Sequence, residues 1–225
     1  MTINYYLFII ISLLSLSFEY QYTHLTTEEV QSLLENENFC IVDTRNQSES
    51  TLGYIYNSIL FDLNVSFSKF FLALVPKDKK IIIITNENDE MNSIKTIVDL
   101  GYEVFGFYYV QEWKYELLKL NFETITYENI DNLVNNNEYI LDVREVDEWK
   151  ETGIIKNSHT FDLSNLLENY VDIKTDGTIH VLCKSGKRAA IAYTFLMNKK
   201  LKNNFTNLEG GILKVIEVGY PLQPY

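Results

Sequence analysis

The chain contains few cysteines, histidines and basic side chains, and each shortage excludes a class of protein. Two cysteines, Cys40 and Cys183, among 225 residues rule out a disulfide scaffold and a four-cysteine zinc site. The three histidines (His24, His159 and His180) lack the spacing of metal ligands, so no metal site is expected. Only 19 Lys and Arg oppose 31 Asp and Glu, and the net charge of −12 argues against nucleic acid as a partner, because a phosphate backbone needs a basic face.

The remaining composition is that of a folded chain. Hydrophobic residues make up 46% of the sequence and charged residues 22%, with 16 Tyr and 13 Phe, so the chain can bury a core and disorder is excluded as a whole-chain description. A length of 225 residues fits one large domain or two compact ones.

The N-terminus carries the longest apolar run, at residues 5–18. Its 14 residues fall short of the roughly 20 that a membrane-spanning helix needs. We therefore predict that 1–22 is a signal peptide or an uncleaved anchor, although no Lys or Arg precedes the run. The alternative is an extra strand or helix packed on the first domain. A signal peptide would place the protein in the secretory pathway or outside the cell. Without one, we expect the cytoplasm or the mitochondrion. Membrane contact is expected only if the segment 1–22 is not cleaved.

An internal repeat organises the rest of the chain. Residues 39–63 and 139–163 both contain an apolar strand, Asp-X-Arg, a polar helix start, a glycine, Asn-Ser and Phe-Asp-Leu. Repeats of this length indicate a duplicated domain. We predict one domain at 23–121 and another at 122–225, with the linker near 120–126.

Strand and helix patterns alternate in each copy. The β-branched runs 81–84 and 179–182 are apolar on both faces, as a buried parallel strand requires, and each is followed by a helical pattern. Threonines near positions 26 and 126 provide capping signals for a helix that opens each copy. This alternation predicts an α/β fold in which each domain has a mainly parallel central sheet flanked by helices.

The two copies differ most where the second of these strands meets its helix. Cys183 stands at the carboxyl end of strand 179–182, where open α/β sheets bind ligands. The next five residues bring a turn-forming glycine and three cations: Lys184, Ser185, Gly186, Lys187 and Arg188. A helix N-terminus and neighbouring cations favour a thiolate, so Cys183 is the candidate nucleophile in an anion-binding loop. Alternatively Cys183 is a small buried hydrophobe, which is the role predicted for Cys40.

The first copy lacks this loop. Aligning the strands places Thr85 where Cys183 stands, and the following residues 86–90 contain three acids and no glycine. The first half of the chain is also the more acidic, with 8 basic and 16 acidic side chains in 1–121 against 11 and 15 in 122–225. We therefore predict that the first domain is inactive and serves packing or shapes a cleft.

In order and spacing, these motifs resemble the rhodanese (thiosulfate sulfurtransferase) family. The matching pieces of the second half are 141–145, Glu148 with Trp149, Gly153, the 183–188 loop, 208–211 and 219–221, and those of the first half are 42–45, Gly53 and 101–102. The resemblance implies two tandem α/β/α domains, of which the carboxyl-terminal one is catalytic. Residues 153–158 depart from the family's Gly-His-Ile-Pro-Gly-Ala stretch, and the loop ends in Arg as in single-domain members, which leaves the substrate open.

The resemblance implies a cofactor-free sulfurtransferase whose partners are a small anionic sulfur donor, such as thiosulfate, and a thiol or cyanide acceptor. Cys183 would carry the sulfur as a persulfide. Its loop would bind the donor and the transferred sulfur, through Lys184, Ser185, Gly186, Lys187 and Arg188. Asp142 and Arg144 are expected to be structural, through buried hydrogen bonds and an ion pair with an acid such as Glu148.

Two other functions remain open at this stage. Phosphatases and arsenate reductases use a related Cys-to-Arg loop, but place five residues between the two ends where 184–187 provides four. A non-catalytic interaction or regulatory protein is favoured by the inactive first copy and opposed by the intact loop of the second. The sequence makes no prediction of oligomeric state.

Overall fold

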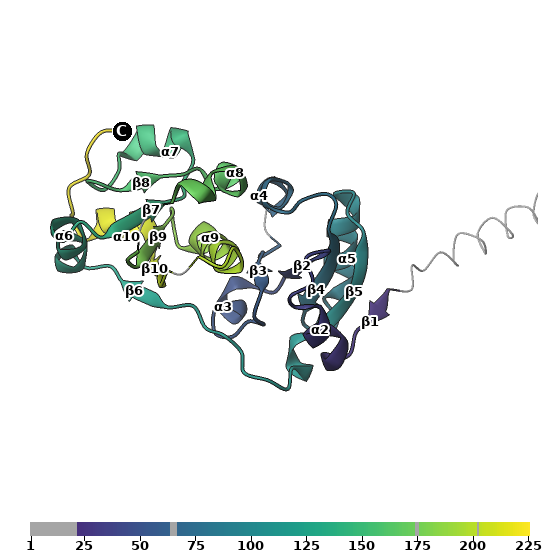
Figure 1. The fold of residues 1–225 in the computed structure, drawn as a ribbon. Coiled ribbons are helices and arrows are strands. Elements are labelled where there is room, and N and C mark those ends of the chain that lie inside the picture. The colour runs from purple at the N-terminus through teal and green to yellow at the C-terminus, as the bar shows by residue number, and fades with distance from the viewer. Residues whose placement is uncertain (1–21, 64–66, 174–175, 202) are drawn as a thin grey trace, which may run out of the picture.

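The computed structural model describes residues 22–63, 67–173, 176–201 and 203–225. The predicted signal or anchor segment, apart from its last residue, lies outside this part of the chain. Within it, no helix has both the length and the apolar character needed to cross a bilayer. The described chain forms two α/β units (Figure 1).

The first unit contains five strands and the helices between them. Its strands are β1 (Thr23–His24), β2 (Phe39–Asp43), β3 (Ser58–Leu60), β4 (Lys80–Thr85) and β5 (Val104–Tyr109). Its helices are α2 (Thr27–Leu33), α3 (Gln47–Ser50), α4 (Phe67–Leu74), α5 (Glu90–Asp99) and the 3-10 turn η1 (Val110–Glu112).

The second unit repeats this order. Its strands are β6 (Phe122–Thr124), β7 (Tyr139–Asp142), β8 (His159–Thr160), β9 (Ile179–Leu182) and β10 (Phe205–Glu209). Its helices are α6 (Tyr127–Asn135), α7 (Val146–Thr152), α8 (Leu166–Asn169), α9 (Lys187–Asn198) and α10 (Gly211–Glu217), with 3-10 turns η2 (Leu163–Asn165) and η3 (Tyr170–Asp172).

Both sheets have the same topology, which confirms the predicted fold class. The strand orders are β1-β5-β4-β2-β3 and β6-β10-β9-β7-β8, and the paired strands of both sheets are parallel. The register is also equivalent, because Asp43 lies beside Ile84 in the first sheet and Asp142 beside Leu182 in the second. Thr85 therefore occupies the place of Cys183.

Alternation along the buried strands explains the layered arrangement. Ile82 and Ile84 of β4 pack with α2 on one face, whereas Ile81 and Ile83 pack with α4 and α5 on the other. All four isoleucines are buried, as expected for a strand that is covered on both sides. The two capping threonines also act as predicted: Thr26 forms a capping box with Glu29 at the start of α2, and Thr126 caps α6.

The linker is shorter than predicted. Residues 120–126 were expected to connect the domains, but Phe122–Thr124 form β6, which pairs with β10 at the edge of the second sheet. A strand of 3 residues is too short to show an alternating pattern in the sequence. The position of β6 is determined by its backbone pairing with β10.

The two units share a core. Helix α9 of the second unit packs against β3 of the first, and one apolar cluster includes Phe61 and Phe71 from the first unit with Ile191 and Phe195 from the second (Figure 1). The backbone N–H of Leu60 donates to the Thr194 hydroxyl at 3.2 Å within this contact. Burial of this apolar surface holds the two units in one arrangement.

Candidate functional site

The site is centred on the turn between β9 and α9. Cys183 follows the last residue of β9, and its Sγ accepts a hydrogen bond from the Gly186 backbone N–H at a distance of 3.1 Å. Gly186 adopts φ 96° and precedes the first turn of α9, a conformation that glycine tolerates best. The sulfur therefore lies at the N-terminus of a 12-residue helix, where backbone N–H groups favour negative charge.

The start of α10 holds the Cys183 turn through two backbone hydrogen bonds. The Ile212 N–H donates to the Cys183 carbonyl at 2.8 Å, and the Leu213 N–H donates to the Lys184 carbonyl at 3.2 Å. This close backbone approach requires Gly211, because a Cβ at that position would lie 2.3 Å from the Cys183 carbonyl oxygen. Gly211 thus permits the contact that fixes the backbone at Cys183.

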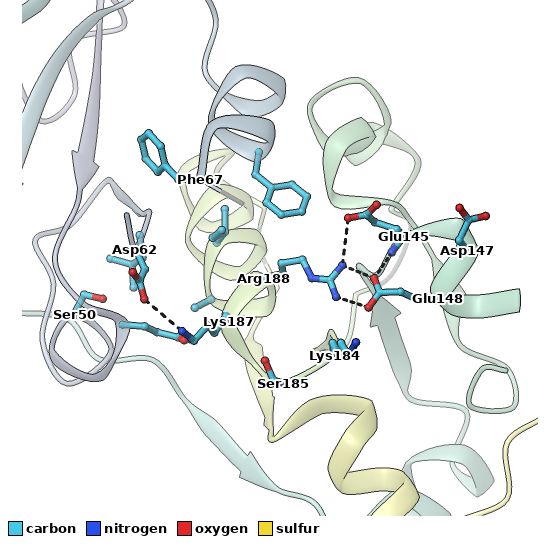
Figure 2. A pocket seen from close by; sticks show the side chains of 15 residues that line it. Ser50, Asp62, Phe67, Glu145, Asp147, Glu148, Lys184, Ser185, Lys187 and Arg188 are labelled. Carbon is cyan, nitrogen blue, oxygen red and sulfur yellow. Dashed lines mark hydrogen bonds and ion pairs between the residues drawn. The ribbon is translucent and has the colours of Figure 1, made fainter. Parts of the chain in front are cut away.

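A cavity of about 380 Å³ opens beside this turn, between the two units. It is lined by Gln47, Ser50, Leu60, Asp62, Phe67, Phe70, Glu145, Asp147, Glu148, Lys184, Ser185, Lys187, Arg188, Ala190 and Ile191 (Figure 2). Cys183 itself is 1% exposed and lies behind this wall. The volume of the cavity is within the range of small-molecule sites, and residues of both units line the cavity.

Arg188 is held by carboxylates at the edge of the cavity. Figure 2 shows its guanidinium extended toward Glu145 and Glu148. The Glu148 carboxylate accepts two hydrogen bonds from it, at 2.5 and 2.7 Å, and Glu145 lies 3.8 Å away. Burial opposes the charged form of both partners, but this pairing outweighs it: the pKa of Glu148 is lowered and that of Arg188 is raised. Arg188 is therefore not a free cation in the loop.

This pairing differs from the expected one. Glu148 was predicted as an ionic partner for Arg144, but Arg144 reaches only the Glu148 backbone carbonyl, at 3.5 Å. Its charge is instead met by Asp142, whose carboxylate accepts from Nε at 3.0 Å and from Nη2 at 2.7 Å. Both side chains are fully buried, and the structural role expected for them stays a prediction. The first unit repeats this pair with Asp43 and Arg45.

The lowered pKa of Glu148 predicts a pH-dependent contribution to stability. Its carboxyl has an ordinary pKa of 4.5 when unfolded and a lower one in the folded protein, so the stabilisation is complete above pH 4.5 and is lost as the pH falls through the folded value. Glu148→Gln is expected to lower the free energy of unfolding by about 2 kcal/mol at pH 7, the typical contribution of hydrogen bonds to a charged group.

Urea unfolding at pH 7 and pH 3 measures this effect. The difference between wild type and Glu148→Gln should shrink at the lower pH, because the Glu148 carboxyl of the unfolded chain is then protonated and folding must remove that proton to form the pair. Glu151→Gln is the matched control, since Glu151 lies exposed on the same helix. A deficit that stays constant down to pH 3 would show that the charged pair is not its source.

The other predicted loop residues face the cavity. Lys184, Ser185 and Lys187 are exposed, and the Lys187 ammonium lies 3.7 Å from the Asp62 carboxylate of the first unit (Figure 2). Gln47 of the first unit also reaches the loop, donating to the Gly186 carbonyl at 3.2 Å. Asp62 and Gln47 were not predicted as site residues. Asp62 stands in the repeated Phe-Asp-Leu motif, a signal that could have identified it.

The corresponding turn of the first unit, residues 85–90, has no cysteine. Thr85 is buried at the end of β4, and the acidic residues 86–90 follow it. Asn86 instead donates to the Glu49 carboxylate at 3.3 Å. Among the described residues, no group of three or more His, Cys, Asp and Glu side chains is placed to hold a metal ion.

Comparison with known proteins identifies the repeated domain. A family model described as the rhodanese-like domain matches the chain twice, at residues 26–113 and 126–217. The uncharacterized protein RP600 of Rickettsia prowazekii is 38% identical over 90 residues, which are 35% of this chain and 72% of that protein.

Solved structures with similar folds include longer proteins. Reduced CoADR-RHD of Bacillus anthracis is 29% identical, with a TM-score of 0.39 and coverage of 44% of this chain and 17% of its own. A thiosulfate sulfurtransferase of Pseudomonas aeruginosa is 18% identical, with a TM-score of 0.40 and coverage of 90% of this chain and 43% of its own. This chain therefore spans less than half of each of these two proteins.

Proposed function

Because this chain belongs to the rhodanese-like domain family, we propose that it is a sulfurtransferase that carries sulfur on Cys183. The observation that carries the proposal is the position of the Cys183 sulfur. It accepts the Gly186 N–H at the start of α9, next to a cavity whose lining includes three cations of the same loop. A helix N-terminus of this kind stabilises a thiolate or a persulfide anion.

The proposed reaction has two displacement steps. The Cys183 thiolate attacks the outer sulfur of an anionic donor such as thiosulfate, the sulfur–sulfur bond of the donor breaks, and sulfite leaves with the bonding electron pair. A thiolate or cyanide acceptor then attacks the outer sulfur of the persulfide, and Cys183 leaves as a thiolate. The two steps transfer one sulfur through a covalent intermediate and need no cofactor.

The loop residues have unequal roles in this proposal. Lys184 and Lys187 are exposed at the cavity and attract the donor anion, while Ser185 is placed to donate a hydrogen bond to it. Gly186 supplies the N–H that contacts the sulfur. Both terminal nitrogens of Arg188, Nη1 and Nη2, already donate to the Glu148 carboxylate. Arg188 therefore attracts the donor only through its positive charge, without a direct hydrogen bond, as long as this pair is intact.

Intact mass of the purified full-length chain tests the proposal. After incubation with thiosulfate, one added sulfur should raise the mass by about 32 Da, and cyanide should remove the gain, as expected for a covalent intermediate. Cys183→Ser should show no gain, and Cys40→Ser, the matched control, should behave like the wild type. Absence of a gain with both thiosulfate and mercaptopyruvate would contradict the proposal.

A second candidate function is a non-catalytic interaction module. It is favoured by the burial of Cys183, which is 1% exposed, and by the absence of a cysteine from the turn at 85–90 of the first unit. A phosphatase or arsenate reductase has less support, because the arginine that would clamp the oxyanion is paired with Glu148. The mass experiment separates sulfur transfer from both alternatives.

A further inference from the structure

A second cavity lies between the two units, at the other end of α9. Its volume is about 390 Å³. It is lined by Leu34, Glu35, Asn36, Glu37, Phe39, Cys40, Ile41, Asn57, Ile59, Leu74, Pro76, Lys79, Phe195, Asn198, Lys199 and Lys200. We call it the junction cavity. The 12 residues of α9 extend over about 18 Å, so the cavity beside Cys183 is well separated from this one.

The junction cavity gathers positive charge in a strongly acidic protein. Three lysines and two glutamates, Glu35 and Glu37, line it, which leaves an excess of one positive charge. Only one of the lysines has a carboxylate partner: Lys200 lies 2.9 Å from Glu35. Lys79 donates to the backbone carbonyl of Glu37 at 2.5 Å. Among the described residues, no ion pair includes Lys79 or Lys199.

Lys79 and Lys199, the two lysines without a carboxylate partner, both line the junction cavity. Lys199 is half-buried, and its ammonium lies 4.9 Å from the ring centre of Phe195 and 5.2 Å from that of Tyr170. Burial lowers the pKa of Lys199, and the charge of Lys79 lowers it further. Two ammonium groups that repel each other in a partly desolvated cavity destabilise the protein. A bound anion would reduce this repulsion.

Two residues at the rim of the cavity have left-handed backbone angles. Asn57 and Lys200 both line the cavity with left-handed φ angles of 65° and 56°. Lys200 directly follows the C-cap of α9, where helices commonly end in this conformation, and Asn57 corresponds to Asn157 (φ 62°) of the second unit, so both angles belong to the repeated fold. The Asn198 side chain donates to the Asn57 carbonyl at 2.9 Å and so joins the two units at this point.

The lining also specifies what kind of anion fits. Apolar side chains such as Phe39, Ile59 and Leu74 form part of the wall, which favours a ligand with an apolar group beside its charge. Cys40 shares the cavity, but burial raises its pKa to about 12, so it remains a thiol and does not act as a nucleophile. Binding at this place would therefore be non-covalent.

We propose that the junction cavity is a second binding site, which takes a small organic anion: a phosphate or carboxylate group held by Lys79 and Lys199, with an apolar body against the apolar wall. The site is separate from the Cys183 turn and does not depend on sulfur transfer. It offers a ligand contact with both units at once, through Lys79 of the first and Lys199 of the second.

Calorimetric titration of the full-length chain with phenyl phosphate at low salt tests the proposal. We expect saturable binding to one site, weakened about tenfold by Lys79→Gln and by Lys199→Gln, because each removes one charged hydrogen-bond donor. Inorganic phosphate should bind about tenfold more weakly than phenyl phosphate, since it lacks apolar surface. Lys95→Gln on an exposed face is the matched control, and circular dichroism checks that each variant is folded.

Cys40 provides an independent readout. In Cys183→Ser it is the only thiol of the chain, and its alkylation by iodoacetamide at pH 9, already slow because burial raises its pKa to about 12, should become slower still when phenyl phosphate fills the cavity. Binding that is absent, that survives both lysine substitutions, or that disappears in Cys183→Ser would overturn the proposal. The last result would assign the ligand to the cavity beside the active turn instead.

Discussion

Gly211→Ala is expected to abolish persulfide formation. A Cβ at position 211 would lie 2.3 Å from the Cys183 carbonyl oxygen and 2.7 Å from the Lys184 carbonyl, both backbone atoms that cannot move without opening the turn. The residue also has φ 61°, where an L side chain is strained. Together the clash and the strain should lower the free energy of unfolding by about 3 kcal/mol. Intact mass after thiosulfate and urea unfolding measure the two effects.

Gly219→Ala separates the strain from the clash. Gly219 has φ 74° but no heavy atom within 4 Å of its would-be Cβ, so this substitution should cost about 1 kcal/mol and leave the cyanide-removable mass gain intact. If Gly211→Ala were to form the persulfide as readily as Gly219→Ala does, the backbone contact between α10 and the Cys183 turn would not be what positions the nucleophile.

Arg144→Ala should be the most destabilising charge substitution in the second unit. It removes the guanidinium that pairs with Asp142 at 2.7 Å, and both side chains are fully buried. The Asp142 carboxylate would then be buried without its counter-charge, which typically costs about 3–5 kcal/mol. The Gly153 carbonyl would also lose its donor from Arg144 at 2.8 Å. The midpoint of urea unfolding is the measurement.

Two variants control this result. Lys150→Ala removes an exposed cation from neighbouring α7 and should change the free energy of unfolding by less than about 0.5 kcal/mol. Arg45→Ala breaks the equivalent pair in the first unit, where Arg45 and Asp43 are also buried, and should be comparably costly. A loss below about 1 kcal/mol for Arg144→Ala would mean that water reaches Asp142 once the arginine is gone.

Much of the fold could be predicted from the sequence because its signals are local. The four consecutive isoleucines of β4, the threonine caps of α2 and α6 and the Asp-X-Arg repeat each depend on a few neighbouring residues. The edge strand β6 was missed and its residues were assigned to the linker. An edge strand of 3 residues has no pattern of its own, and its backbone is satisfied only by pairing with β10.

In the candidate site too, the features that depend on neighbouring residues could be predicted, and those that depend on distant segments could not. Cys183, its cationic loop and the matching piece 208–211 were visible in the sequence because a strand, a turn and a helix follow one another along the chain. The partner of Arg188 was not, because Glu148 is 40 residues away and two arginines of this unit could have reached it. Asp62 and Gln47 enter the site from the other unit, and Gln47 is 139 residues from the glycine that it contacts.

Local patterning along the chain thus specified a duplicated parallel α/β domain with one intact cysteine turn, since periodicity, caps and turn residues act over a few positions. Packing across the units determined the electrostatic state of that turn and the shape of its surroundings. Burying α9 against β3 brings Asp62 to Lys187, and Arg188 pairs with Glu148 at the edge of the same cavity. The cause is that charge pairing and cavity shape depend on distances between distant segments, which are set when the shared apolar core forms.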